Sequence, residues 1–77
     1  MELQKVIELV TAEYERANRK FSFFVSSHEA YGVMMEEVEE FWDLVKENGP
    51  DCRKRDELVQ VAAMAIKAIV SMYKEKA

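Results

Sequence analysis

The chain has 77 residues, of which 49% are hydrophobic and 34% charged, and its net charge is −4. A domain this short buries only about 60% of the surface that its unfolded chain exposes, so its length favours a partner subunit over a stable isolated monomer. No apolar stretch approaches the roughly 18 uncharged residues of a membrane span, and the N-terminus does not resemble a signal peptide, so we expect a cytoplasmic protein that binds no membrane.

The first predicted helix covers about residues 2–20. Apolar residues recur along it at alternating spacings of four and three, at Leu3, Ile7, Val10, Tyr14, Ala17 and Phe21. This spacing is typical of a helix that packs lengthwise on another helix. The sequence therefore predicts a continuous seam along this segment.

The second predicted helix covers about residues 26–47. Ser26 precedes Glu29 by three positions, which is the pattern of a capping box, and Gly49 and Pro50 end the helix because Gly accepts the left-handed cap and Pro cannot continue it. Residues 29–47 include seven acids and one base. Such a segment repels a nucleic acid backbone, so we expect no nucleic acid partner.

The third predicted helix covers about residues 52–74 and is apolar around most of its circumference. The exception is a narrow polar strip of Gln60, Lys67 and Ser71. A helix of this kind must be central, and two other helices cannot enclose it fully. We therefore expect one all-α domain over residues 1–77, a three-helix protomer that completes a four-helix-type bundle by forming a homodimer or homotetramer. The single cysteine, Cys52, excludes an internal disulfide.

Several carboxylates fall on the apolar side of the helical wheels. Glu37 lies inside the apolar arc of the second helix, Glu36 and Glu40 lie at its edge, and Glu57 lies among apolar residues of the third helix. An ionised carboxylate that is buried costs several kcal/mol unless it is protonated, paired with a base or bound to a cation. A solvated acidic face is the alternative interpretation.

The basic residues favour a cation among these possibilities. The second helix contains one base, Lys46, and the run Arg53, Lys54 and Arg55 lies at the start of the third helix, toward the end of the bundle. A hard divalent cation with oxygen ligands neutralises such a cluster more readily. The sequence therefore predicts a Mg²⁺ site, which could also take Mn²⁺.

The order of these acids resembles a known motif. The pattern Glu36-Glu37-x-x-Glu40, followed after sixteen residues by Glu57-x-x-Gln60, resembles the EExxE and ExxD motifs of the all-α nucleoside triphosphate pyrophosphohydrolases, the MazG-like and dimeric dUTPase-like superfamily. The resemblance extends over roughly residues 26–73, where HEAYGVMMEEVEEFW and ELVQVAAMAIKAI look like short, phage-type members.

This resemblance implies an enzyme that hydrolyses a nucleoside triphosphate to a monophosphate and pyrophosphate, as in housecleaning of the nucleotide pool. The metal ligands would be Glu37, Glu40, Glu57 and Gln60. Glu36 and Glu37 would be the catalytic carboxylates, Glu36 serving as a further ligand or as the base that orients the attacking water. A bound divalent cation neutralises phosphate charge and lowers the pKa of water.

Two departures from the family pattern keep a rival function open. Gln60 stands where the motif has Asp, and its amide offers a carbonyl oxygen but no negative charge. The chain also lacks the fourth helix that is usual in the family. The rival is a catalytically inactive MazG-like module for oligomeric assembly or nucleotide binding, and a purely structural bundle is a third possibility.

Other residues are candidates for substrate binding, each with a simpler alternative. Lys67 and Arg53 could bind phosphates, although a basic run such as the one containing Arg53 is usually solvated. His28 and Tyr31 could contact a nucleobase, or cap the helix and form an interface. Phe21, Phe23 and Phe24 could form a base pocket, although phenylalanines at a bend between two helices are usually core residues, and Trp42 is expected at a subunit interface.

Overall fold

The chain folds into three helices joined by short connections. The computed structural model describes residues 1–76, with α1 at Leu3–Lys20, α2 at Ser27–Lys46 and α3 at Asp51–Lys76. These bounds lie within two residues of the predicted ones, and no strand occurs in residues 1–76. The predicted all-α class is confirmed.

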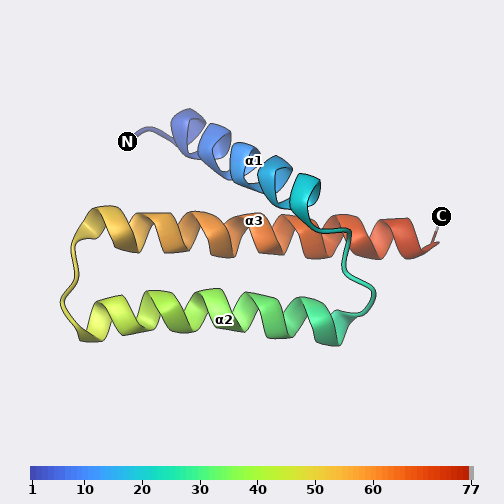
Figure 1. The fold of residues 1–77 in the computed structure, drawn as a ribbon. Coiled ribbons are helices and arrows are strands. Elements are labelled where there is room, and N and C mark those ends of the chain that lie inside the picture. The colour runs from blue at the N-terminus through green and yellow to red at the C-terminus, as the bar shows by residue number, and fades with distance from the viewer. Residues whose placement is uncertain (77) are drawn as a thin grey trace.

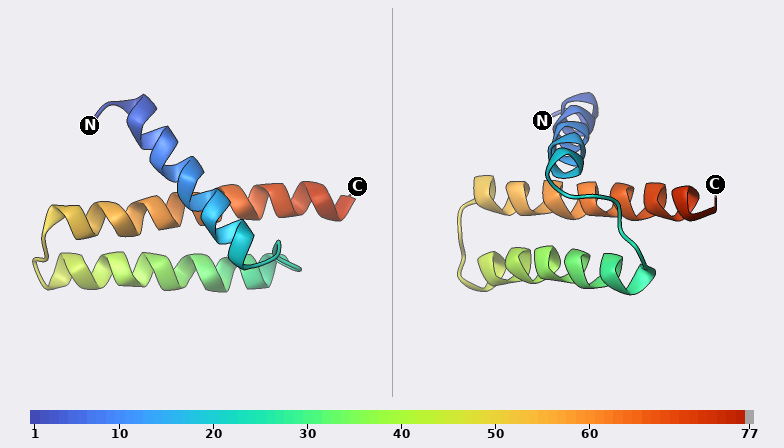
Figure 2. Two further views of the ribbon diagram at one scale, coloured as in Figure 1. Left: turned by 45° about the horizontal axis from the view of Figure 1, so that its top comes forward. Right: turned by 45° about the vertical axis from the view of Figure 1, so that its right-hand side comes forward.

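α3 is the central helix of the protomer. α2 and α3 run antiparallel as a hairpin, and α1 crosses α3 obliquely on the side away from α2 (Figures 1 and 2). α1 and α2 do not pack against each other, so α3 supplies the surface that holds both. Within residues 1–76, no helix combines the length and apolarity needed to cross a bilayer.

The ends of α2 are fixed by local hydrogen bonds. At its start, the Glu29 N–H donates to Ser26 Oγ at 3.1 Å, as the predicted capping box requires, but Glu29 Oε1 accepts the N–H of Val25 at 3.1 Å and not that of the N-cap Ser26. At its end, the left-handed residue is Asn48, with φ 57°, and not Gly49 as predicted. Asn tolerates this conformation, and a Cβ at Gly49 would lie 3.0 Å from Leu44 Cδ2, so a larger residue there would press on that side chain.

The core is small and lies where α1 crosses the hairpin. Its buried residues are Val10, Ala17, Phe24, Ala30, Ala63, Met64 and Ala68. Only the middle of the predicted α1 seam contributes, through Val10, Tyr14 and Ala17. Leu3 and Ile7 are exposed because the oblique crossing carries the start of α1 away from α3, and Phe21, expected in the core, is exposed as well. The linker between α1 and α2 is held to α3 by the Phe24 N–H, which donates to Ser71 Oγ at 3.0 Å.

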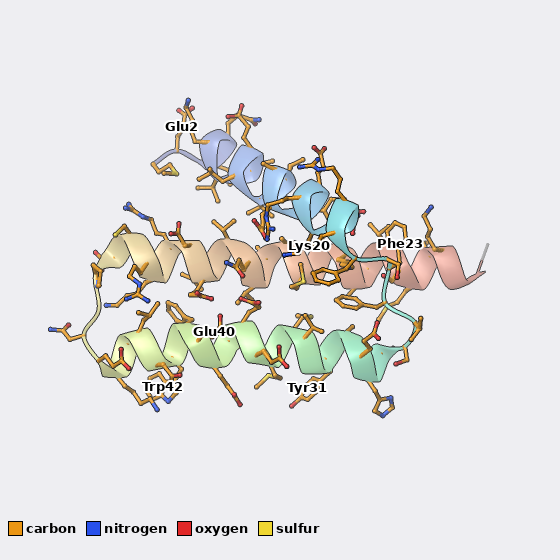
Figure 3. The ribbon with its side chains drawn as sticks, viewed as in Figure 1. Glu2, Lys20, Phe23, Tyr31, Glu40 and Trp42 are labelled. Carbon is orange, nitrogen blue, oxygen red and sulfur yellow. The ribbon has the colours of Figure 1, made fainter. Side chains whose placement is uncertain are left out.

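Large apolar side chains remain exposed on all three helices. The outer side of α2 presents Tyr31 and Trp42, which point away from α3 (Figure 3), and α3 exposes Leu58, Ile69 and Tyr73. An added Cβ at Gly32, also on α2, would meet no atom within 4 Å, so no neighbouring helix of the same chain approaches it closely. Apolar surface of this extent is typical of an interaction site.

Candidate metal centre

Three carboxylates converge between α2 and α3. Glu37 and Glu40 come from α2 and Glu57 from α3, and one oxygen of each lies within 4.8 Å of the others. Glu40 points from α2 toward α3 (Figure 3), while Glu37 and Glu57 are half-buried. The one-turn spacing on α2 and the antiparallel hairpin produce this convergence, as the helical wheels predicted.

The cluster lacks a neutralising base. The ion pairs formed by the side chains of residues 1–74 engage Glu13, Asp43 and Asp51, and none involves the three converging acids. Burial, followed by the charge of Glu40 and contact with Glu57, raises the pKa of Glu37 to about 7. Burial and the neighbouring Glu40 also raise the pKa of Glu57. Bringing like charges together in a partly desolvated site disfavours their ionised forms.

The donor set fits a hard divalent cation. Glu57 Oε2 is buried and has no hydrogen-bond partner within the described chain, although buried polar atoms are normally satisfied. Three carboxylates from two rigid helices supply the oxygen ligands that Mg²⁺ and Mn²⁺ prefer, and their edge toward solvent leaves positions for water or phosphate. The chemistry of the residues therefore supports the predicted ligands Glu37, Glu40 and Glu57.

Gln60 lies directly against Glu37. With its amide turned so that the NH₂ group faces the carboxylate, it donates to the two oxygens of Glu37 at 2.7 and 3.3 Å. This contact orients Glu37 toward the other acids. Gln60 can thus act on the cluster through Glu37, which is a different role from the direct ligation predicted for it.

A cavity of about 520 Å³ adjoins the cluster. Glu36, Glu37, Gln60 and Lys67 all line it, so the structure brings these four predicted site residues together. The other walls come from the end of α1 and the linker, which contributes Phe21, Phe23 and Phe24. A volume of this size is in the range of small-molecule sites.

The remaining predicted site residues lie elsewhere. His28, Tyr31 and Arg53 are exposed and do not line the cavity, so their substrate-binding role stays a prediction that needs a second subunit. Arg16 and Lys20 of α1 also line the cavity, and neither was predicted from the sequence as a site residue. Their position follows from how α1 crosses the hairpin, for which the sequence contains no local pattern, whereas the run of phenylalanines was a usable indication of a linker wall.

The raised pKa of Glu37 predicts how the metal-free protein responds to pH. Because the folded state keeps a proton that the unfolded state loses between pH 4.5 and about 7, stability is greatest below this window and falls as pH rises through it. After allowance for solvent screening, we expect a loss of roughly 1 to 2 kcal/mol in EDTA. Urea unfolding of the wild type and Glu37→Gln at a series of pH values measures the free energy of unfolding of each protein. The variant should lack this loss of stability, and an equal loss in both proteins would contradict the assignment of the raised pKa to Glu37. Glu39→Gln, on the exposed side of α2, is the control.

Comparison of the chain with models of protein families, with curated proteins and with solved structures found no match. The resemblance to the all-α pyrophosphohydrolases therefore remains a prediction from the motif.

Proposed function

We propose that the protein is a Mg²⁺-dependent nucleoside triphosphate pyrophosphohydrolase that acts as a cytoplasmic homo-oligomer. The observation that supports this proposal most is the convergence of Glu37, Glu40 and Glu57 without a base, with Glu57 Oε2 left unpaired and Glu37 lining the adjoining cavity. Mn²⁺ would substitute for Mg²⁺, since both prefer oxygen ligands.

The chain's own residues have distinct tasks in this function. Glu37, Glu40 and Glu57 would hold the cation, which when bound supplies charge neutralisation for the phosphates and an acidified water. Glu36 is exposed and lines the cavity next to Glu37, so its carboxylate is free to accept a proton from the attacking water. Gln60 keeps Glu37 in its orientation through the amide contact.

A catalytically inactive module that binds nucleotides or assembles is the second candidate. It is favoured by Gln60, which occupies the position of an anionic ligand and donates to Glu37 instead of offering a charge. A cluster with one carboxylate fewer neutralises a divalent cation less completely. The two candidates differ in whether a bound triphosphate is turned over.

The test is pyrophosphate release from a panel of ribo- and deoxyribonucleoside triphosphates with Mg²⁺ or Mn²⁺. We expect release by the wild type, a loss of roughly 100-fold or more in Glu40→Gln, and a gain in Gln60→Asp, which adds an anionic ligand. Glu39→Gln removes a charge from the exposed side of α2 and should behave as wild type. Nucleotide binding without turnover in all four proteins would favour the inactive module.

A further inference from the structure

Lys67 is a buried cation that the carboxylate cluster does not explain. Its side chain is 3% exposed, it lies two helical turns beyond Gln60 on α3, and it lines the same cavity. The ammonium sits 4.8 Å from the centre of the Phe24 ring and 6.0 Å from that of Phe21. A lysine rarely occupies such a place without a partner.

No described residue pairs with this ammonium. Among the side chains described, those of residues 1–74, its Nζ takes part in none of the hydrogen bonds and in none of the ion pairs. The charge of Glu29 acts on it, but Glu29 Oε1 accepts the Val25 N–H of the helix cap. Burial lowers the pKa of Lys67, because the charged form has lost water without gaining a counter-ion.

An anion that enters through the cavity would supply the counter-charge that this ammonium lacks. An ammonium offers three donors and no acceptor, and the ring of Phe24 replaces only part of its hydration. A neutral ligand would bury the charge further without compensating it. Lys20 lines the same end of the cavity, 5.7 Å from the Phe21 ring, and adds a second positive charge, whereas Arg16 is occupied by Glu13 at 2.6 Å.

We propose that the end of the cavity around Lys67 and Lys20 binds the terminal phosphate of a polyphosphate ligand. The rise from Gln60 to Lys67 along α3 is about 10 Å, so one extended ligand can contact the carboxylate cluster through a cation and Lys67 directly. This inference rests on the proposed function only for the other contact of the ligand, the cation held by the carboxylate cluster. The contact between the phosphate and Lys67 can be measured without metal.

This arrangement defines the substrate class of the site. A triphosphate reaches both anchors, whereas a monophosphate held at the cluster leaves Lys67 unpaired. Lys67 therefore selects for triphosphates over monophosphates, and the pyrophosphate product competes with the substrate for the same contact.

The experiment measures the affinity for inorganic pyrophosphate by calorimetry at neutral pH, in EDTA and with Mg²⁺. We compare the wild type, Lys67→Met and Lys74→Met. Lys74 is the matched control, since its ammonium also lies 4.8 Å from a phenylalanine ring, that of Phe23, but the residue is exposed and outside the cavity. Lys67→Met should weaken binding roughly 10- to 100-fold and Lys74→Met should not.

A second measurement uses the wild type alone and does not depend on the folding of a variant. In protein with ¹³C-labelled lysines, pyrophosphate should raise the pKa of the one lysine whose pKa begins below the usual range. An unchanged pKa for that lysine would overturn the inference, as would equal pyrophosphate affinity in wild type and Lys67→Met, or a wild type that binds none in either buffer. If Lys67→Met keeps the wild-type affinity for pyrophosphate and loses affinity only for a nucleoside such as uridine, this end of the cavity binds a base and the inference is overturned.

The two proposals fail in different ways. Pyrophosphate binding in EDTA that depends on Lys67, together with no effect of Mg²⁺ and no turnover, would refute the pyrophosphohydrolase and keep the anion site. Metal-dependent turnover, with full activity and full pyrophosphate affinity in Lys67→Met, would support the pyrophosphohydrolase and refute the anion site at Lys67.

Discussion

Mn²⁺ at millimolar concentration is expected to raise the thermal midpoint of the wild-type protein and to leave that of Glu57→Gln unchanged. A ligand at about 100 times its dissociation constant stabilises the folded state by about 2.7 kcal/mol, which in a domain of this size corresponds to a shift of roughly 10 °C or more. Glu57 supplies the α3 side of the cluster, and its substitution by Gln keeps the volume while removing the charge. Thermal unfolding followed by circular dichroism measures both proteins.

The metal-free state gives this experiment an internal check. Without metal, Glu57→Gln should be at least as stable as the wild type, because the substitution removes repulsion among Glu37, Glu40 and Glu57. Glu39→Gln, on the exposed side of α2, controls for a general change in net charge and should keep the full response to Mn²⁺. Equal shifts in Glu57→Gln and the wild type would show that Mn²⁺ binds elsewhere.

The carboxylate cluster was predictable because helical periodicity determines it. Glu37 and Glu40 are one turn apart, and a Gly-Pro stop after α2 forces α3 to return alongside it, so Glu57 comes opposite them. Both pieces of information are local in sequence. The burial that raises the pKa of Glu37 follows from the same helical wheel.

The helical period of the sequence did not indicate which side of α3 is covered by the rest of the protomer. Its polar strip faces inward, where Lys67 and Ser71 are buried, while Ile69 on another side of the same helix is exposed. The strip is covered because Ser71 Oγ accepts the Phe24 N–H and also donates to the Lys67 carbonyl at 2.7 Å, which fixes the linker there. The contact between Phe24 and Ser71 joins residues far apart in sequence, and no local pattern indicates it.

The oblique crossing of α1 is a second feature that the sequence did not indicate. A seam spaced by four and three predicts lengthwise packing, yet only Val10 and Ala17 of that seam are buried, and Leu3 remains exposed. The core that anchors α1 consists largely of small residues, including Ala63 and Ala68 on α3, which allow close approach at one crossing point. The unused half of the seam is available to another chain.

The outer face of α2 is the surface on which we expect a second copy of the chain. Its apolar residues are spaced by four and three, as in a helix that packs lengthwise on a partner: Tyr31, Met35, Val38, Trp42 and Val45. Tyr31 is 67% and Trp42 54% exposed in the protomer, and both point away from α3 (Figure 3). A two-fold axis would bring each such face onto its copy and cover the apolar surface that one chain leaves bare.

Trp42→Glu is expected to convert the oligomer into smaller species, down to the monomer if this face forms the only interface. A central tryptophan contributes about 2 kcal/mol or more to an interface. In a two-fold symmetric dimer the substitution is present in both copies, so the effect doubles and the dissociation constant of the dimer should rise by roughly 1000-fold. Sedimentation velocity across a range of concentrations measures this. The substitution leaves the protomer intact because the side chain is mostly exposed and makes one intrachain contact of note, with Lys46 at 5.8 Å.

Tyr73→Glu separates a specific interface from a general effect of added charge. Tyr73 is an aromatic residue on α3 that is 74% exposed, so the same substitution there tests the exposed apolar surface of α3. If Tyr73→Glu dissociates the oligomer and Trp42→Glu does not, the copies meet on α3. A wild type that is monomeric at every concentration contradicts self-association on either face, and the three helices would then be stable alone despite their small core.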